Sequence, residues 1–254
     1  MKLRIKSYIM TAAAATIVAV AVNSCTKAAA SNELRYDYPQ IFDIAYTPDT
    51  LHRHNGLFTD AGAWIGFTPP EKGEWVTGFC GPYSIDMNRR EWLAKSAVTV
   101  SPQSAEKIIA DSVCYYPGEL FISSRYDSGE ISQRLHFIDA NTILLTVNNT
   151  LKKAIKYTGC DWQRDMKLCQ SGNSVIAVHP TGETFVITFP QDVKVKVDAD
   201  NYTAVSAGKD CEHVALGFFC SPEEARAGLH KCAELLENPG DALDANSARW
   251  EEAF

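Results

Sequence analysis

The sequence lacks the short motifs that most often reveal an enzyme class. It has no G-x-S-x-G turn, no glycine-rich phosphate loop and no H-E-x-x-H helix, so it offers no basis for predicting a serine hydrolase, a nucleotide-binding protein or a zinc peptidase. His52 and His54 are two residues apart but have no third ligand nearby. We therefore predict no metal site and no cofactor.

Basic residues are scarce relative to acidic ones. The chain has 24 Lys and Arg against 31 Asp and Glu, a net charge of −7, and its first 24 residues hold Lys2, Arg4 and Lys6 with no acid. Without that segment the net charge falls to −10. A phosphate-rich partner would be repelled, so nucleic-acid binding is not expected. With 46% hydrophobic and 22% charged residues, the composition is that of a globular protein.

No apolar run reaches the twenty residues of a membrane-spanning helix. The apolar stretch from Ile9 to Val22 follows three basic residues and has the size of a secretory signal. It ends in Val22-Asn23-Ser24-Cys25, which resembles a bacterial lipobox, so we predict a lipoprotein signal peptide at 1–24, lipidation of Cys25 and a tether at 25–35. The alternative is an ordinary cleaved signal. Thr26 favours anchoring to the outer membrane, with membrane contact through the lipid only.

No C-x-x-C pair occurs, which removes the usual signal of a zinc knuckle or a thioredoxin-like site. Besides Cys25 the chain has seven cysteines, at positions 80, 114, 160, 169, 211, 220 and 232. An odd number leaves at least one thiol unpaired. Cys160 with Cys169 and Cys211 with Cys220 are candidate disulfides, and the other cysteines are expected to be small buried residues.

The segment 36–219 reads as successive β-strands. Val193, Val195 and Val197 alternate with charged residues, a period of two that gives one buried and one solvated face. Pro180-Thr181-Gly182-Glu183 and Asp127-Ser128-Gly129 separate further strand-like segments and are typical of hairpin turns. We predict a mainly β fold, an antiparallel super-β-sandwich, followed by two C-terminal linker helices.

The two helices are expected within 220–254. Ser221-Pro222-Glu223-Glu224 is typical of a helix start with a capping box, and Ala225, Leu229, Cys232 and Leu236 form one apolar stripe. The second helix should begin at Asp241 and place Trp250 and Phe254 on one face. Such a short helix is marginal alone. Its aromatic face either folds back on the sheets or belongs to a linker towards a further domain.

One string stands out for its glycines and its tryptophan. In Asp60-Ala61-Gly62-Ala63-Trp64-Ile65-Gly66 the glycines indicate a bulge or a close backbone approach. Trp64 could stack on a sugar, but packing in the first strand is the favoured interpretation.

Three segments together resemble a known family. Phe58 to Gly66, Gly78-Phe79-x-Gly81 and Ala248-Arg249-Trp250-Glu251-Glu252 are similar, in this order, to the amino-terminal region of bacterial glycoside hydrolase family 63 enzymes, which are exo-acting α-glucosidase-like proteins. The resemblance spans about residues 36–254. It implies an N-terminal super-β-sandwich joined by linker helices to an (α/α)6 barrel that holds the acid and base carboxylates of an inverting mechanism.

The resemblance ends where that barrel would begin, so no catalytic residue is carried over and this chain alone is expected to be inactive. Its partner would be the helical catalytic barrel, with an oligosaccharide possible. Candidate acids in the chain are Asp60, Glu71, Glu74, Asp86, Asp127 and Glu130, and nothing in their spacing selects a pair. The residues expected to face the barrel or a sugar are Asp60, Gly62, Trp64, Gly66, Trp250 and Phe254.

Two other functions fit the same sequence. The first is a stand-alone glycan-binding surface lipoprotein, which a row of exposed aromatics at Trp64, Trp75 and Trp92 would favour. The second is a scaffold lipoprotein without a ligand.

Overall fold

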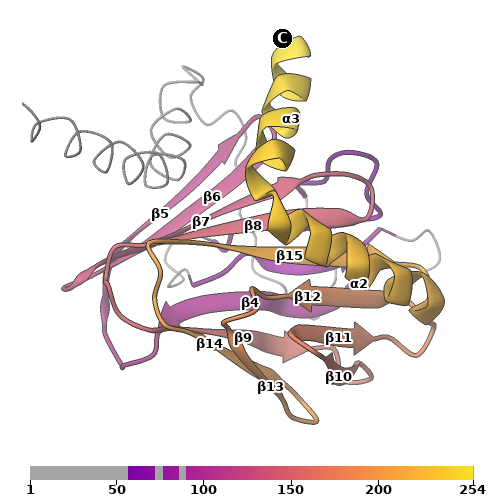
Figure 1. Ribbon diagram of the computed structural model, residues 1–254, viewed down its shortest axis with the longest axis horizontal. Helices are drawn as coiled ribbons and strands as arrows, with labels where there is room; N and C mark the ends of the chain where they lie inside the picture. Colours follow the sequence, from indigo (N-terminus) through magenta and orange to yellow (C-terminus); the bar gives the residue numbers. More distant parts are fainter. Residues whose placement is uncertain (1–56, 72–76, 86–89, 254) are drawn as a thin grey trace, which may run out of the picture. The chain divides into compact units, whose positions relative to one another are not determined.

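The computed structural model describes residues 57–71, 77–85 and 90–253. Cys25, His52, His54, Glu74, Trp75, Asp86 and Phe254 lie outside these ranges. The described residues form two β-sheets and two C-terminal helices (Figure 1). Neither helix is long and apolar enough to cross a membrane.

One sheet has seven strands in the order β1-β2-β4-β9-β14-β13, with β3 paired to β2. Neighbouring strands are antiparallel except for one parallel contact between β2 and β4, where Gly81 pairs with Ser96. The bounds are β1 Ile65–Thr68, β2 Cys80–Ser84, β3 Glu91–Trp92, β4 Ala94–Pro102, β9 Ile155–Trp162, β13 Lys194–Val197 and β14 Tyr202–Ser206.

The other sheet has eight antiparallel strands in the order β10-β11-β12-β15-β8-β7-β6-β5. Two such sheets confirm the predicted β-sandwich. The bounds are β5 Ile108–Tyr116, β6 Glu119–Tyr126, β7 Gly129–Phe137, β8 Thr142–Asn149, β10 Lys167–Ser171, β11 Ser174–Val178, β12 Thr184–Thr188 and β15 Cys211–Phe219.

The core lies between the sheets and contains a chain of aromatic rings. Phe58 meets the Phe137 ring edge to face at 5.4 Å, and Tyr157 lies 5.3 Å from Phe189, within the range where aromatic pairs stabilise beyond their buried area. Polar groups also cross the core, because the Tyr157 hydroxyl donates to Glu212 Oε2 at 2.7 Å. The two sheets are therefore held in a fixed pairing by specific bonds as well as by apolar burial.

Helix α2, Pro222–Glu237, covers β12 and β15 on the outer face of the eight-stranded sheet (Figure 1). Its start is as predicted: Ser221 Oγ accepts from Glu224 N at 3.2 Å, although the Glu224 carboxylate reaches back to Cys220 N at 3.1 Å and not to Ser221. The buried stripe includes Gly228. A Cβ there would lie 1.9 Å from Phe219 Cζ, so a glycine is needed for this close contact.

Helix α3, Pro239–Glu252, begins two residues earlier than predicted and contacts β7. Pro239 occupies the first helical position, where its missing N–H costs nothing, so it begins this helix. Asn246 is the buried residue of α3, with Leu243, Ser247 and Trp250 half-buried beside it. Trp250, one residue of the predicted face, thus lies on the inward side, and Phe254 lies outside the described residues.

Neither proposed disulfide forms. Cys160 and Cys169 are free thiols. Cys211 begins β15 and Cys220 follows its last residue, so the two are nine positions apart, roughly 30 Å along the strand, far beyond the reach of a disulfide.

Candidate functional site

The loop before β1 holds Asp60 in a defined position. Phe58 and Phe67 exchange backbone hydrogen bonds of 2.8 and 2.9 Å, and Ala63 N donates to Asp60 O at 3.0 Å. Ala61 and Gly62 both have positive φ, 53° and 77°, as the two central residues of a tight hairpin turn require. Ala61 N also donates to Asp60 Oδ1 at 2.6 Å. The turn therefore fixes both the backbone and the carboxylate of Asp60.

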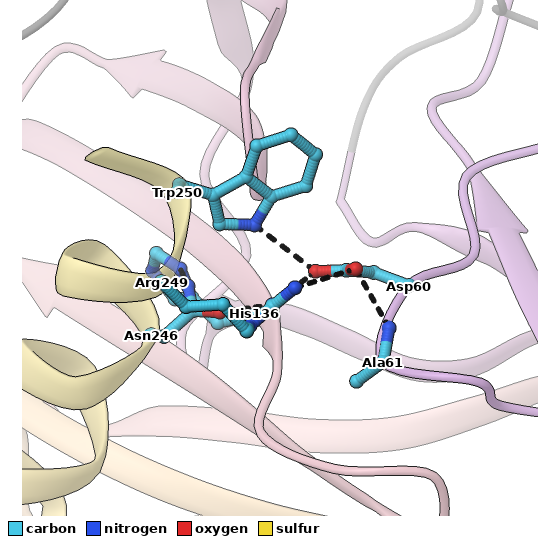
Figure 2. A network of polar contacts seen from close by, with 6 residues as sticks. All are labelled: Asp60, Ala61, His136, Asn246, Arg249 and Trp250. Carbon is cyan, nitrogen blue, oxygen red and sulfur yellow. Dashed lines mark hydrogen bonds and ion pairs between the residues drawn. The ribbon is translucent and has the colours of Figure 1, made fainter. Parts of the chain in front are cut away.

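That carboxylate binds two adjacent residues of α3 (Figure 2). Arg249 Nη1 donates to Oδ1 at 2.9 Å and Arg249 Nη2 donates to Oδ2. Trp250 Nε1 donates to Oδ2 at 3.0 Å. The side chain of Asp60 is 11% exposed and that of Arg249 is 41% exposed. This is a bidentate, charge-assisted contact between segments that are 189 residues apart in the sequence.

The electrostatics of Asp60 follow from these contacts. Burial alone would raise its pKa, but the hydrogen bonds from Arg249, Ala61 and Trp250 and the Arg249 charge outweigh burial and lower it. The same carboxylate raises the pKa of the Arg249 guanidinium. Asp60 is therefore ionised at neutral pH and has no proton to donate.

A polar network continues from Arg249 into the eight-stranded sheet. Arg249 Nη2 donates to Asn246 Oδ1 at 2.7 Å, and Asn246 Nδ2 lies 3.4 Å from His136 Nδ1. His136 Nε2 lies 3.4 Å from Glu119 Oε2, and Arg134 donates to the other oxygen of Glu119. We call the set Asp60, Glu119, Arg134, His136, Asn246, Arg249 and Trp250 the helix clasp.

Burial lowers the pKa of His136, although the Glu119 charge opposes this effect. The imidazole is therefore neutral at neutral pH. Within the clasp, two carboxylates then face two guanidinium groups, and the formal charge is zero. Glu119, His136 and Asn246 are buried, and a partly buried set in which charges are paired holds elements in one arrangement. The clasp fastens α3 to the β5–β6 turn, to β7 and to the loop of Asp60.

Trp250 is half-buried, and its ring lies on Gly118 in the β5–β6 turn. A Cβ on Gly118 would be 2.3 Å from Trp250 Cδ1 and Nε1, so only glycine leaves room for the indole. Gly118 also has φ +77°. The ring thus finds at least part of its partner surface within this chain, as the fold-back alternative expected.

The remaining predicted site residues have separate roles. Gly62 has open space around its Cα, whereas a Cβ on Gly66 would lie 2.3 Å from Leu57 Cδ2, which makes Gly66 a close-packing position. Trp64 is 56% exposed, so the expectation that it packs in the core was wrong. Its carbonyl accepts from Ile85 N at 2.8 Å, and its backbone is therefore held while the indole faces solvent.

Three of the other candidate acids, Glu71, Asp127 and Glu130, lie within the described residues. Glu71 and Asp127 are exposed and Glu130 is half-buried. The buried acids are ones that sequence reasoning missed: Glu119 at 3%, Glu183 at 8% and Glu212 at 3% exposure. Glu212 could have been found, because it occupies an inward position of the alternating strand that contains Val214 and Leu216.

These buried acids hold structure together. Glu212 accepts from Tyr157 and Ser206 across the core, and Glu183 accepts from Ser84 Oγ at 3.0 Å. Ser84 lies on β2 of one sheet, and Glu183 directly precedes β12 of the other. Carboxylates that join two sheets in this way are used to fix the fold.

No family model matches the chain, and no curated protein matches it. Solved structures similar to part of it include a glycoside hydrolase family 81 protein from Clostridium thermocellum, at 12% identity over 62% of this chain and 21% of its own. A heparan sulfate lyase from Pedobacter heparinus is 12% identical over 61% of this chain and 28% of its own. A heparinase III is 9% identical over 65% of this chain and 28% of its own. All three have a TM-score of 0.36.

The chain thus spans between a fifth and somewhat over a quarter of these proteins. A TM-score of 0.36 establishes neither a family nor an activity for it. None of the three names mentions family 63, so that resemblance stays a prediction.

Proposed function

We propose that this chain is the N-terminal, non-catalytic β-sandwich module of a family 63-like glycoside hydrolase of the α-glucosidase type. The observation that carries the proposal is the contact of Asp60 with Arg249 and Trp250. Two of the three segments on which the resemblance rests, Phe58 to Gly66 and Ala248 to Glu252, contact each other through it. Residues of one functional unit are expected to meet in this way although they lie far apart in the sequence.

The state of the acids supports a non-catalytic role. Inverting hydrolysis needs one protonated and one ionised carboxyl about 6.5–9.5 Å apart, and the acid partner needs a raised pKa. Asp60, the acid within the resembling motif, has a lowered pKa and is bound by Arg249. We assign the catalytic carboxylates of the proposed enzyme to a helical barrel outside these residues.

An activity assay tests this proposal directly. The purified chain should not hydrolyse p-nitrophenyl α-glucoside above the buffer rate, and Asp60→Asn should not change that result. Turnover that follows the protein through purification, and is lost when one described acid is changed to its amide, would refute the proposal. Reading the coding region after codon 254 gives a second test: an in-frame helical domain supports the module, and an unrelated sequence contradicts it.

The exposure of Trp64 favours a second candidate, a glycan-binding surface lipoprotein. A solvated indole on a fixed turn offers a flat apolar face to the C–H groups of a sugar ring. Trp92, by contrast, is buried against Tyr83, with ring centroids 5.0 Å apart. The described residues thus give one exposed tryptophan and not a row.

Titration with α-glucan oligosaccharides tests this second function. Trp64→Ala should abolish the heat of binding. Ile109→Ala is the matched control, because Ile109 is the other exposed large apolar side chain among the described residues, at 48%. Equal binding by both variants would remove Trp64 from the proposal.

We also propose that the protein is exported and anchored to the outer membrane through a lipid on Cys25. Incorporation of a labelled fatty acid in cells should be lost in Cys25→Ala. A label that persists in that variant would contradict the anchor.

A further inference from the structure

A cavity of about 420 Å³ lies between the second half of α2 and the strands β11, β12 and β15, and none of the clasp residues lines it. The α2 wall consists of the apolar residues Leu229, Ala233 and Leu236, with Glu237 at the end of the helix. The β15 wall carries Cys211 and His213. The cavity has the size of a small-molecule site and places a thiol and an imidazole on one of its walls.

Cys211 and His213 are two residues apart on β15, so their side chains are on the same face of the sheet. Cys211 Sγ lies 3.8 Å from His213 Nε2. Thr146 is the direct cross-strand partner of His213 on β8, and its hydroxyl lies 3.1 Å from His213 Nδ1. Cys211 thus supplies a nucleophilic sulfur and His213 a base beside it on β15. Thr146 on β8 supplies the group that orients this base.

From this geometry we propose that Cys211 is a reactive thiol that undergoes exchange with small disulfides, with His213 as its base and the cavity as the site that admits the disulfide. In the reactive tautomer His213 Nδ1–H donates to Thr146, and the Nε2 lone pair faces the sulfur. The Cys211 S–H proton passes to Nε2, and Sγ attacks one sulfur of the disulfide. A new S–S bond forms, the old one breaks, and the departing thiolate takes the proton from the imidazolium.

The electrostatic environment suits a neutral base. Burial lowers the pKa of His213, and the nearby His136 lowers it further. The cavity also has Lys209 and Glu237 in its wall, and Lys209 is paired with Asp192 at 2.7 Å. His213 is therefore uncharged at neutral pH and able to accept a proton.

Three other described thiols, Cys232, Cys160 and Cys169, have different surroundings. Burial on the inward side of α2 raises the pKa of Cys232 to about 12, which keeps it protonated. Burial and the adjacent Asp161 raise the pKa of Cys160. Cys169 is exposed and free, so it serves as a reference for a thiol limited by accessibility alone.

The full chain provides the first test without any substitution. It is incubated at neutral pH with bis(hydroxyethyl) disulfide, a small neutral probe, and fragment-ion mass spectrometry follows the mixed disulfide at each cysteine. Cys211 is half-buried, so accessibility alone would make it slower than Cys169. We expect it to be faster by about tenfold or more, because it has a base. A rate at Cys211 equal to or below that at Cys169 overturns the proposal.

Two substitutions then separate the base from the cavity. His213→Gln should lower the Cys211 rate by about tenfold and leave Cys169 unchanged, while His230→Gln, on the exposed side of α2, should change neither. Ala233→Phe puts a larger side chain into the cavity, leaves Cys211 and His213 unsubstituted and should also slow Cys211. An unchanged Cys211 rate in folded His213→Gln overturns the role of the base, and an unchanged rate in Ala233→Phe overturns that of the cavity.

Discussion

Replacing Asp60 by Asn removes one negative charge from the helix clasp while keeping the shape of the side chain. The Arg249 guanidinium is partly solvated at 41% exposure, whereas the Asp60 carboxylate is only 11% exposed. An exposed ion pair contributes about 0–1 kcal/mol, and a hydrogen bond to a charged group about 1.5–3 kcal/mol. Because the pair is partly exposed, we expect Asp60→Asn to weaken the attachment of α3 by about 1–2 kcal/mol. The new amide NH₂ contributes to this loss, since it would face two N–H donors.

This loss should be local, because Asp60 anchors α3 and not the core. Amide hydrogen exchange over residues 246–252 should accelerate about 5- to 30-fold, the factor that corresponds to 1–2 kcal/mol. Exchange in β8 and β15 should not change. Asp127→Asn is the matched control, since it removes the same charge from an exposed turn. If α3 exchanges no faster in Asp60→Asn than in the wild type or in Asp127→Asn, the clasp does not hold the helix.

Three further predictions concern the same region. Gly118→Ala should destabilise the protein by about 2–3 kcal/mol, since φ is positive and the new methyl would displace the Trp250 ring. Gly172→Ala is the control, because Gly172 also has positive φ but open space around it, so this variant measures the cost of the backbone conformation alone. Equal urea midpoints for the two variants would contradict the contact between Gly118 and Trp250. The pKa of folded Asp60 is below its ordinary value of 3.8, so the carboxylate contributes its full stability above pH 3.8 and loses it as the pH falls through the folded pKa. Amide exchange in α3 should therefore accelerate over that acidic range in the wild type and not in Asp60→Asn. Trp64→Ala should change the free energy of unfolding by less than about 0.5 kcal/mol, as a urea titration can check; a larger loss would mean that the indole packs.

The fold class was predictable because most of the strands that were recognised have one face on the core. Val195 and Val197 alternate with lysine and aspartate, and the segment forms β13 as expected. β5 was harder to find. Its residues Ile108 and Ile109 are consecutive apolar positions, one half-buried and one exposed. This edge strand is stabilised by pairing along its length with β6. A local sequence pattern does not predict such a pairing.

The site was predictable only in part. The motif drew attention to Asp60, but its partners Arg249 and Trp250 are separated from it by most of the chain, and no periodicity links them. Trp64 was misjudged although the signal was present. Ile65 and Phe67 point into the core, so a period of two places Trp64 on the opposite face.

The helix clasp limits what Asp60 can do in either proposed function. A helix of fourteen residues is marginal in water without tertiary contacts, so the direction of α3 depends on the few groups that bind it. The turn that orients Asp60 towards α3 is followed by Trp64, whose backbone carbonyl accepts a hydrogen bond from Ile85 N. One short loop therefore sets both the direction of the helix and the position of the exposed indole. Because its carboxylate is taken up by these hydrogen bonds, Asp60 acts by positioning α3. Chemistry on a sugar would have to come from other groups.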